Sequence, residues 1–139
     1  MKLFLGALAV FLFAGIGILH IYWGLGGRWW TENIIPERDG VSLFTLIPAG
    51  FFVVSALFFF AAWVVLARIN LVWIPLSPSL VDLGIAIMAG IFFIRVVGDF
   101  QYAGIFKSIT GTPFSYWDTR VYTPISAMLS MLMVGLRMP

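Results

Sequence analysis

Four long apolar stretches occupy most of this chain and constrain its fold more than any other feature. They cover residues 3–27, 43–67, 80–98 and 121–137. A helix crosses the hydrocarbon core of a bilayer with about 20 apolar residues. The stretches also lack the alternation of apolar and polar residues that marks β-barrel strands. We therefore expect one integral membrane domain over residues 1–139, an all-α, polytopic bundle of four transmembrane helices.

Composition supports this class and excludes others. Of the 139 residues, 62% are hydrophobic and only 10% are charged, whereas soluble domains average about 45–50% apolar and about 25% charged residues. A soluble chain of this size has too little interior to bury so much apolar surface. The chain has no cysteine, which excludes disulfides and thiolate chemistry. It has no cluster of lysines and arginines, so we expect no nucleic-acid partner.

Two pairs of a hydroxyl residue and a proline mark expected helix starts. Ser77 before Pro78 has the form of an N-cap followed by a first-turn proline. Thr123 before Pro124 has the same form, although the fourth helix could also start earlier and tolerate Pro124 near its first turn. The third loop, at about 20 residues, is longer than most connections in compact domains. We expect it to form a lid over one face.

Four crossings divide the polar residues unevenly between the two membrane faces. The face with the first and third loops receives most of the charged residues, the only histidine and most candidate interfacial aromatic residues. This asymmetry predicts that one face carries the function. The orientation in the membrane stays open, because the larger number of Lys and Arg residues on that face and the basic N-terminus argue in opposite directions.

His20 is the ionisable side chain placed inside the first span. Such a side chain is costly in a membrane and suggests a functional site by default. Gly17 and Gly24, about one turn away on either side, would let another helix approach the imidazole closely. One interpretation is a histidine that makes an interhelical hydrogen bond, and another is ligand binding or proton transfer. A lone histidine without cysteine is a poor zinc or haem site, so we expect no metal and no cofactor.

Arg95, Asp99 and Tyr102 have the spacing of one helix face at the end of the third stretch. The simplest interpretation is an ion pair between Arg95 and Asp99 within one helix. The functional alternative is a clamp for an anion or a carbonyl, with Arg95 as the donor and Asp99 as its orienting group or as a base.

Other polar residues on this face have structural interpretations. Asp118 or Thr123 could cap the fourth helix, and Arg120 could reach the interface. Glu37 and Asp39 fit a solvated turn better than a cation site. The candidate ligand-binding residues of this face are His20, Tyr22, Trp23, Arg28, Arg95, Asp99, Tyr102, Asp118, Arg120 and Tyr122.

Two strings of residues indicate a family. The first is HIYWGLGGR at 20–28, and the second is RVVGDFQYAGIFK at 95–107. The second string continues, after a turn, with TPF at 112–114 and DTRVYTP at 118–124. Together they resemble a small bacterial four-helix membrane family catalogued as a domain of unknown function, although Thr123 stands where a serine is expected. The resemblance implies a four-helix architecture in the bacterial inner membrane and implies no activity.

Three functions are compatible with these residues, and the motifs of nucleophile elbows, Walker loops, zincins and dinucleotide-binding sites are absent from the sequence. We favour a ligand-binding or accessory module with a polar pocket at one face, partnered by membrane lipids, a hydrophobic small molecule, a second copy or a larger membrane complex. The first alternative is an intramembrane enzyme acting on a lipid or isoprenoid-like substrate, which needs His20 and Asp99 within hydrogen-bond reach for acid–base chemistry. The second alternative is an oligomeric transporter or channel.

Overall fold

The computed structural model describes residues 1–38, 41–43 and 47–138, and it is mainly helical. Its helices are α1 (Lys2–Gly24), α2 (Pro48–Arg68), α3 (Pro78–Val97), α4 (Pro113–Trp117) and α5 (Thr123–Arg137). The shorter elements are the 3₁₀ turn η1 (Thr31–Asn33), the hairpin strands β1 (Glu37–Arg38) and β2 (Val41–Ser42), and the π-helical turn η2 (Asp118–Tyr122). The helices α1, α2 and α3 are each long and apolar enough to cross a membrane.

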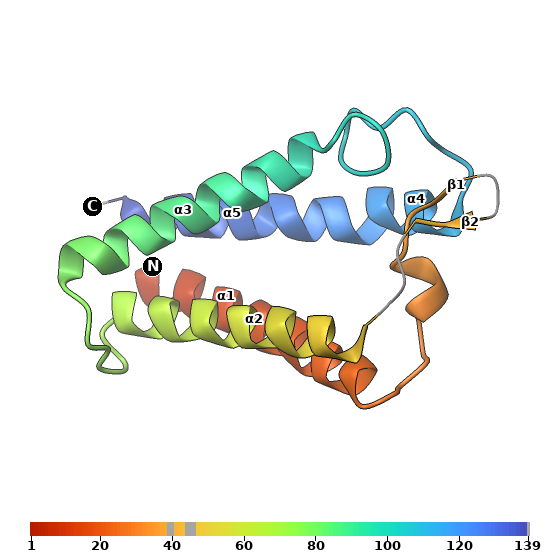
Figure 1. Cartoon of the computed structure of the whole chain (residues 1–139). Coiled ribbons are helices and arrows are strands. Elements are labelled where there is room, and N and C mark those ends of the chain that lie inside the picture. The colour runs from red at the N-terminus through yellow and green to blue at the C-terminus, as the bar shows by residue number, and fades with distance from the viewer. Residues whose placement is uncertain (39–40, 44–46, 139) are drawn as a thin grey trace.

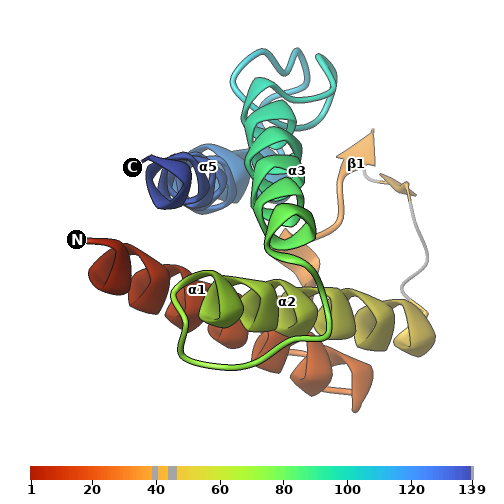
Figure 2. The same cartoon turned by 90° about the vertical axis from the view of Figure 1, so that its left-hand side faces the viewer.

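The four long helices form two antiparallel pairs that stack as two layers (Figures 1 and 2). In one layer α1 packs along α2, and in the other α3 packs along α5. The N-terminus, the end of α5 and the α2–α3 connection lie at one end of the bundle, which we call the terminal face. The β1–β2 hairpin, α4 and the connection 98–112 lie at the opposite end, the loop face. His20 and Asp99 therefore belong to the same end of the bundle.

A serine joins the two helices of each layer. The hydroxyl of Ser55 donates to the carbonyl of Gly17 at 2.9 Å, and the hydroxyl of Ser130 donates to the carbonyl of Ala89 at 3.0 Å. Such bonds satisfy hydroxyl groups that lipid could not. The close approach expected at Gly17 is made by the ring of Phe59 on α2, because a Cβ at Gly17 would lie 3.1 Å from that ring.

The buried core lies in the half of the bundle next to the terminal face. It uses the first halves of α1 and α3, the second half of α2, the part of α5 from Leu129 onward, and one residue of the α2–α3 connection. Its members are Ala9, Phe13, Ala62, Val64, Val65, Ile74, Val81, Ile85, Leu129, Leu132, Met133 and Leu136. In the half next to the loop face, the same helices enclose a cavity.

The fourth helical segment begins well before the expected residue 121. The Thr112 hydroxyl accepts a hydrogen bond from the amide of Ser115 at 3.1 Å, the Ser115 hydroxyl accepts one from the amide of Thr112 at 3.2 Å, and Pro113 occupies the first turn. This capping box starts a helical run that continues through η2 into α5. The third loop is therefore confined to residues 98–112 and is shorter than expected.

Pro124 explains why this run widens into a π turn. A proline inside a helix has no N–H to donate, and its ring clashes with the carbonyl four residues earlier. The wide turn η2 ends two residues before Pro124 and includes the residue four positions before it, so it relieves that clash. The prediction that Thr123 caps the helix is wrong, because Thr123 has helical dihedral angles and lies inside the run. The proposed capping role of Asp118 is wrong for the same reason.

The other helix ends follow local chemistry. The Ser77 cap is confirmed, because its hydroxyl accepts from the amide of Leu80 at 3.3 Å. The first helix ends at Gly24 rather than at 27, shortly before Gly26 adopts φ +94°. The second begins at Pro48 rather than at 43. The candidate residue Asp39 lies outside the described residues.

Candidate functional site

A cavity of about 820 Å³ lies between the two helix layers in the loop-face half. Its volume is in the range of about 300–1,000 Å³ that is typical of small-molecule sites. All four long helices, the first loop, α4 and η2 contribute to its wall. The lining residues are Ile16, Leu19, His20, Trp23, Trp29, Trp30, Ile34, Ile47, Gly50, Phe51, Val54, Phe58, Phe92, Arg95, Phe114, Val121, Tyr122, Ile125, Ser126 and Leu129.

Aromatic rings lie at both ends of the cavity, which is partly open to the outside. At the inner end, Phe58 and Phe92 pack against the core residue Phe13, with ring centroids 6.0 Å and 5.7 Å away. At the loop face, Trp30 of the first loop packs against Trp117 with centroids 4.3 Å apart. The first loop therefore covers the cavity. The third loop does not act as the expected lid, because none of residues 98–112 lines the wall.

His20 lies on the wall within an aromatic cluster. Its ring centroid is 5.1 Å from that of Trp23 and 5.7 Å from that of Phe58. Its Nδ1 is bonded to the carbonyl of Ile16 at 2.8 Å. This bond lies within α1, so it differs from the interhelical bond that the sequence suggested. Because a carbonyl only accepts, Nδ1 carries the hydrogen in this contact.

Arg95 reaches across to the fourth helical segment. Its Nη2 donates to Oδ1 of Asp118, so the predicted Arg95–Asp99 pair is replaced by an interhelical one. The reason is local: Gly98 adopts φ +92° and ends α3, which removes Asp99 from the helical turn that i, i+4 spacing requires. A Cβ at Gly98 would overlap the carbonyl of Ala103, so the backbone return at this point requires glycine.

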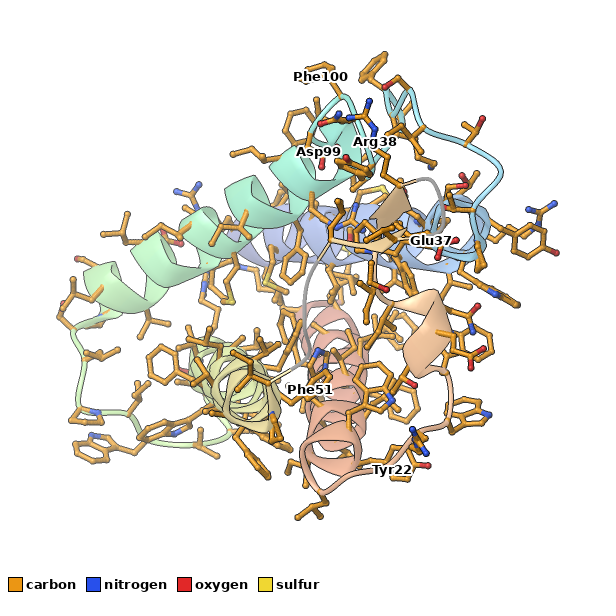
Figure 3. The ribbon with its side chains drawn as sticks, turned by 45° about the vertical axis from the view of Figure 1, so that its right-hand side comes forward. Tyr22, Glu37, Arg38, Phe51, Asp99 and Phe100 are labelled. Carbon is orange, nitrogen blue, oxygen red and sulfur yellow. The ribbon has the colours of Figure 1, made fainter. Side chains whose placement is uncertain are left out.

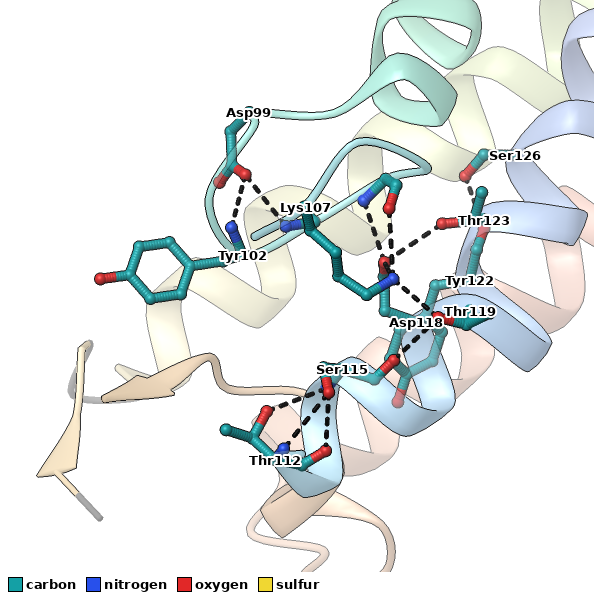
Figure 4. A network of polar contacts seen from close by, with 12 residues as sticks. Asp99, Tyr102, Lys107, Thr112, Ser115, Asp118, Thr119, Tyr122, Thr123 and Ser126 are labelled. Carbon is teal, nitrogen blue, oxygen red and sulfur yellow. Dashed lines mark hydrogen bonds and ion pairs between the residues drawn. The ribbon is translucent and has the colours of Figure 1, made fainter. Parts of the chain in front are cut away.

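Asp118 is the centre of a polar network (Figure 4). Its side chain is fully buried, and Oδ2 accepts from Lys107 Nζ and from the amide of Gly104, each at 2.9 Å. The Thr123 hydroxyl adds a contact at 3.2 Å. Burial raises the pKa of Asp118, but hydrogen bonds from Arg95 and Lys107 and the charge of Arg95 outweigh it, and the pKa lies below its ordinary value. The ionised carboxylate therefore ties the third loop and α3 to the fourth segment.

Asp99 binds the backbone of the third loop and does not line the cavity. Its Oδ1 accepts from the backbone amides of Gln101, Tyr102 and Ala103 at 2.7–2.9 Å. Slight burial raises the pKa of Asp99, but these backbone bonds lower it further, so it lies below the ordinary value. Figure 3 shows Asp99 on the outer loop, away from the cavity residue Phe51. The structure therefore does not join His20 and Asp99 as the acid–base hypothesis requires.

The ten candidate residues separate into three groups. The first group, His20, Trp23, Arg95 and Tyr122, lines the cavity. The second is Asp118, which accepts a hydrogen bond from Arg95 and does not line the cavity itself. The remaining candidates lie off the wall. Among them, the hydroxyl of Tyr22 accepts from the amide of Trp29, and the Arg120 guanidinium lies 3.8 Å from the ring centre of Tyr116. The other candidates that do not line the cavity are Arg28, Asp99 and Tyr102.

Sequence reasoning missed Lys107 and the aromatic wall. From the sequence, Lys107 has no role beyond its place at the end of the second family string, and its contact with the buried Asp118 reveals its role. Phe51, Val54 and Phe58 follow helical spacing on one face of α2. That stripe carries little information in the sequence, because α2 is apolar around its whole circumference.

Within residues 1–38, 41–43 and 47–138, no three His, Asp or Glu side chains gather as a candidate metal site. No curated protein and no solved structure matches this chain. A family model matches residues 13–133, and it is described as "Protein of unknown function (DUF3995)". That match spans most of the chain and includes both residue strings, 20–28 and 95–107. This protein therefore belongs to the DUF3995 family.

Proposed function

We propose that this protein is a membrane-embedded binding module that holds a lipophilic small molecule between its two helix layers. One observation carries the proposal: the cavity of about 820 Å³ has a mostly apolar, aromatic wall that also includes His20 and Arg95. Ligand sites typically combine such a wall with a few polar groups that orient the ligand. Four helices contribute to the wall, so binding would also stabilise their packing.

The proposal includes a fourth membrane crossing. The helix α5 packs antiparallel along α3, which is long enough to cross a bilayer. A helix that runs beside a transmembrane partner passes through the same layer of lipid. The fourth crossing would use residues 121–137, with Asp118 before it at the membrane surface. Placement in the bacterial inner membrane rests on the family resemblance and stays a prediction.

A binding role explains the polar groups better than the two alternatives. The acid–base hypothesis lacks its pair, because the carboxylate of Asp99 is bonded to its own loop. Transport normally uses polar groups near the middle of the bilayer. Here Ser55 and Ser130 are each bonded to a neighbouring helix carbonyl.

Tryptophan fluorescence provides a test, because Trp23, Trp29 and Trp30 line the cavity. The protein in lipid nanodiscs would be titrated with a dibromostearic acid, its methyl ester and the corresponding alcohol, whose bromine atoms quench indole fluorescence on contact. We expect at least one of them to give a saturable component above the quenching caused by the bilayer. Val54→Phe should remove that component by filling the cavity.

The matched control is Val53→Phe. Val53 is the preceding residue on α2, is 60% exposed and does not line the cavity. This variant should quench like the wild type. Failure of all three probes to give a saturable component would contradict the proposed function. Equal saturable quenching in Val54→Phe and the wild type would place the ligand elsewhere and would also contradict it.

A further inference from the structure

Most polar side chains on the cavity wall already have hydrogen-bond partners. The indole N–H of Trp23 donates to a backbone carbonyl of the first loop at 2.8 Å. The indole of Trp30 donates to the hydroxyl of Tyr122 at 2.8 Å, and that hydroxyl donates to another first-loop carbonyl at 3.1 Å. Ser126 donates to the carbonyl of Tyr122 at 2.7 Å. These groups therefore stabilise the wall and are not free to orient a ligand.

Three polar groups on the wall are left with unused hydrogen-bonding capacity among the described residues. Among these residues, the indole N–H of Trp29 has no acceptor. The Arg95 guanidinium is bonded to Asp118 through Nη2, and its Nη1 is buried there without an acceptor and without contact to open space. His20 uses Nδ1 to donate to Ile16, so Nε2 of the neutral imidazole is an acceptor. The cavity thus offers one cationic donor, one indole N–H and one basic nitrogen.

The charges around Arg95 do not balance. Arg95 and Lys107 carry two positive charges and share the single carboxylate of Asp118. Lys107 is 7% exposed and contacts three acceptors: Asp118, the Gly104 carbonyl and the Thr119 hydroxyl. The surplus positive charge therefore lies at Arg95, whose side chain is 32% exposed and lines the cavity. A charge beside an apolar cavity is stabilised by a counter-charge with direct hydrogen bonds.

We infer that the ligand is an apolar chain with an oxyacid head group, either a carboxylic acid or a phosphate monoester. One oxygen of the anionic head accepts from the accessible part of the Arg95 guanidinium, and the remaining P–O–H of a phosphate monoanion donates to Nε2 of His20. The head thereby supplies the missing negative charge. The chain packs against Phe51, Phe58 and Phe92. This inference rests on the proposed function and specifies the chemistry of its ligand.

Neutral head groups meet only part of this requirement. An alcohol could donate to Nε2 of His20 and accept from Arg95, but it would leave the surplus positive charge uncompensated. An ester accepts from Arg95 but carries no negative charge either. Hydrogen bonds to charged groups are stronger than neutral ones, so the acid should bind at least about tenfold more tightly than its methyl ester or the alcohol.

The same quenching titration tests this order of affinity on the wild-type protein, which needs no variant to fold. The dissociation constants of a dibromostearic acid, its methyl ester and the alcohol are compared in nanodiscs of neutral lipid. Competition with dodecanoate and with dodecyl phosphate then distinguishes a carboxylate from a phosphate as the preferred oxyacid. Displacement by either one supports the inference.

Arg95→Gln tests the role of the guanidinium charge. A glutamine amide can keep a hydrogen bond to Asp118 but carries no positive charge, so Asp118 then balances Lys107 alone. We expect this variant to fold and its preference for the acid to fall to less than about threefold. Arg120→Gln is the matched control, because it removes a cation from the same face that does not line the cavity. It should leave the preference unchanged.

The outcomes separate the two proposals. Saturable binding of acid, ester and alcohol with equal affinity would overturn the oxyacid inference and leave the binding function standing. An acid preference that persists unchanged in Arg95→Gln and also in His20→Phe would overturn the assignment of the head group to these residues. Absence of saturable binding for every probe would overturn the binding function and, with it, the inference.

Discussion

The two halves of the bundle contain the same four helices and pack them in different ways. In the half next to the terminal face, Phe13, Val65, Ile85 and Met133 are fully buried and form a continuous core. In the half next to the loop face, the helices enclose the cavity. Both halves are strongly apolar, so hydropathy does not distinguish them. The shapes of the side chains and the positions of the polar groups do.

The forces that hold each half together also differ. Lipid is as apolar as the helices, so helix association in a membrane depends on close packing and hydrogen bonds. The terminal-face half relies on packing. In the loop-face half, directed polar contacts tie the first loop and α3 to the fourth helical segment, such as Trp30 to Tyr122 and Arg95 to Asp118. Such contacts fix the positions of the helices without filling the space between them.

The largest predicted effect is at Asp118. Asp118→Ala removes the carboxylate that pairs with Arg95 and Lys107, and leaves Lys107 buried without a counter-charge. We expect a loss of about 3–5 kcal/mol in the free energy of unfolding, measured by thermal unfolding in detergent. The matched variant at the other face is Asp82→Ala. Asp82 is 40% exposed and pairs with Arg137, which is 47% exposed, and more distantly, at 3.9 Å, with Arg68. We therefore expect a loss of about 1 kcal/mol or less.

Acid titration gives a second measurement of the same contact. Because the folded state lowers the pKa of Asp118, its stabilisation is present at neutral pH and is lost as the pH falls through that lowered value. The loss begins near the ordinary aspartate pKa of about 3.9. Asp118→Asn should flatten this part of the profile. In the thermal unfolding experiment, equal losses of stability in Asp118→Ala and Asp82→Ala would contradict the comparison, because the ion pairs at the two faces would then contribute equally.

The next effect contrasts two phenylalanines. Phe13→Ala creates a void in the closed core, where Phe13 is fully buried, and should cost about 3 kcal/mol. Phe51→Ala only enlarges a cavity that already exists, so its cost should be about 2 kcal/mol smaller. Chemical denaturation of both variants in the same detergent measures the difference. A larger loss for Phe51→Ala would contradict the assignment of the core to the terminal-face half.

The smallest effect concerns helix packing. A Cβ at Gly17 would lie 3.1–3.3 Å from the Phe59 ring, whereas a Cβ at Gly90 meets no atom within 4 Å. Both substitutions by alanine favour the helix by similar amounts. Gly17→Ala should therefore be about 1 kcal/mol less stable than Gly90→Ala. Thermal unfolding of the pair checks this, and equal stability would mean that Phe59 moves aside without cost.

Several features could be predicted from residues alone because they depend on local chemistry. Long apolar stretches indicate three of the helices, and the Ser77–Pro78 pair indicates where α3 begins. The parity of the expected crossings places His20 and Arg95 at one face. That reasoning needs only the number of helices and not their packing.

Other features could not be predicted because they depend on one backbone torsion or on a distant partner. The Arg95–Asp99 pair assumed that α3 continues, and Gly98 ends it. Thr123 and Pro124 resemble a helix start, but the capping box at Thr112 begins the segment earlier. Asp118, assigned a capping role from its neighbours in sequence, is bonded to residues 11 and 23 positions away.

The amino-acid sequence by itself determined the class of this protein, because apolar length and the scarcity of charge are sums over neighbouring residues. Tertiary structure decided where the cavity lies, which wall groups retain unused hydrogen-bonding capacity and which carboxylate Arg95 binds. Those properties depend on side chains from different helices meeting in space. In helices that are apolar all around, the linear order of residues does not show which faces will meet.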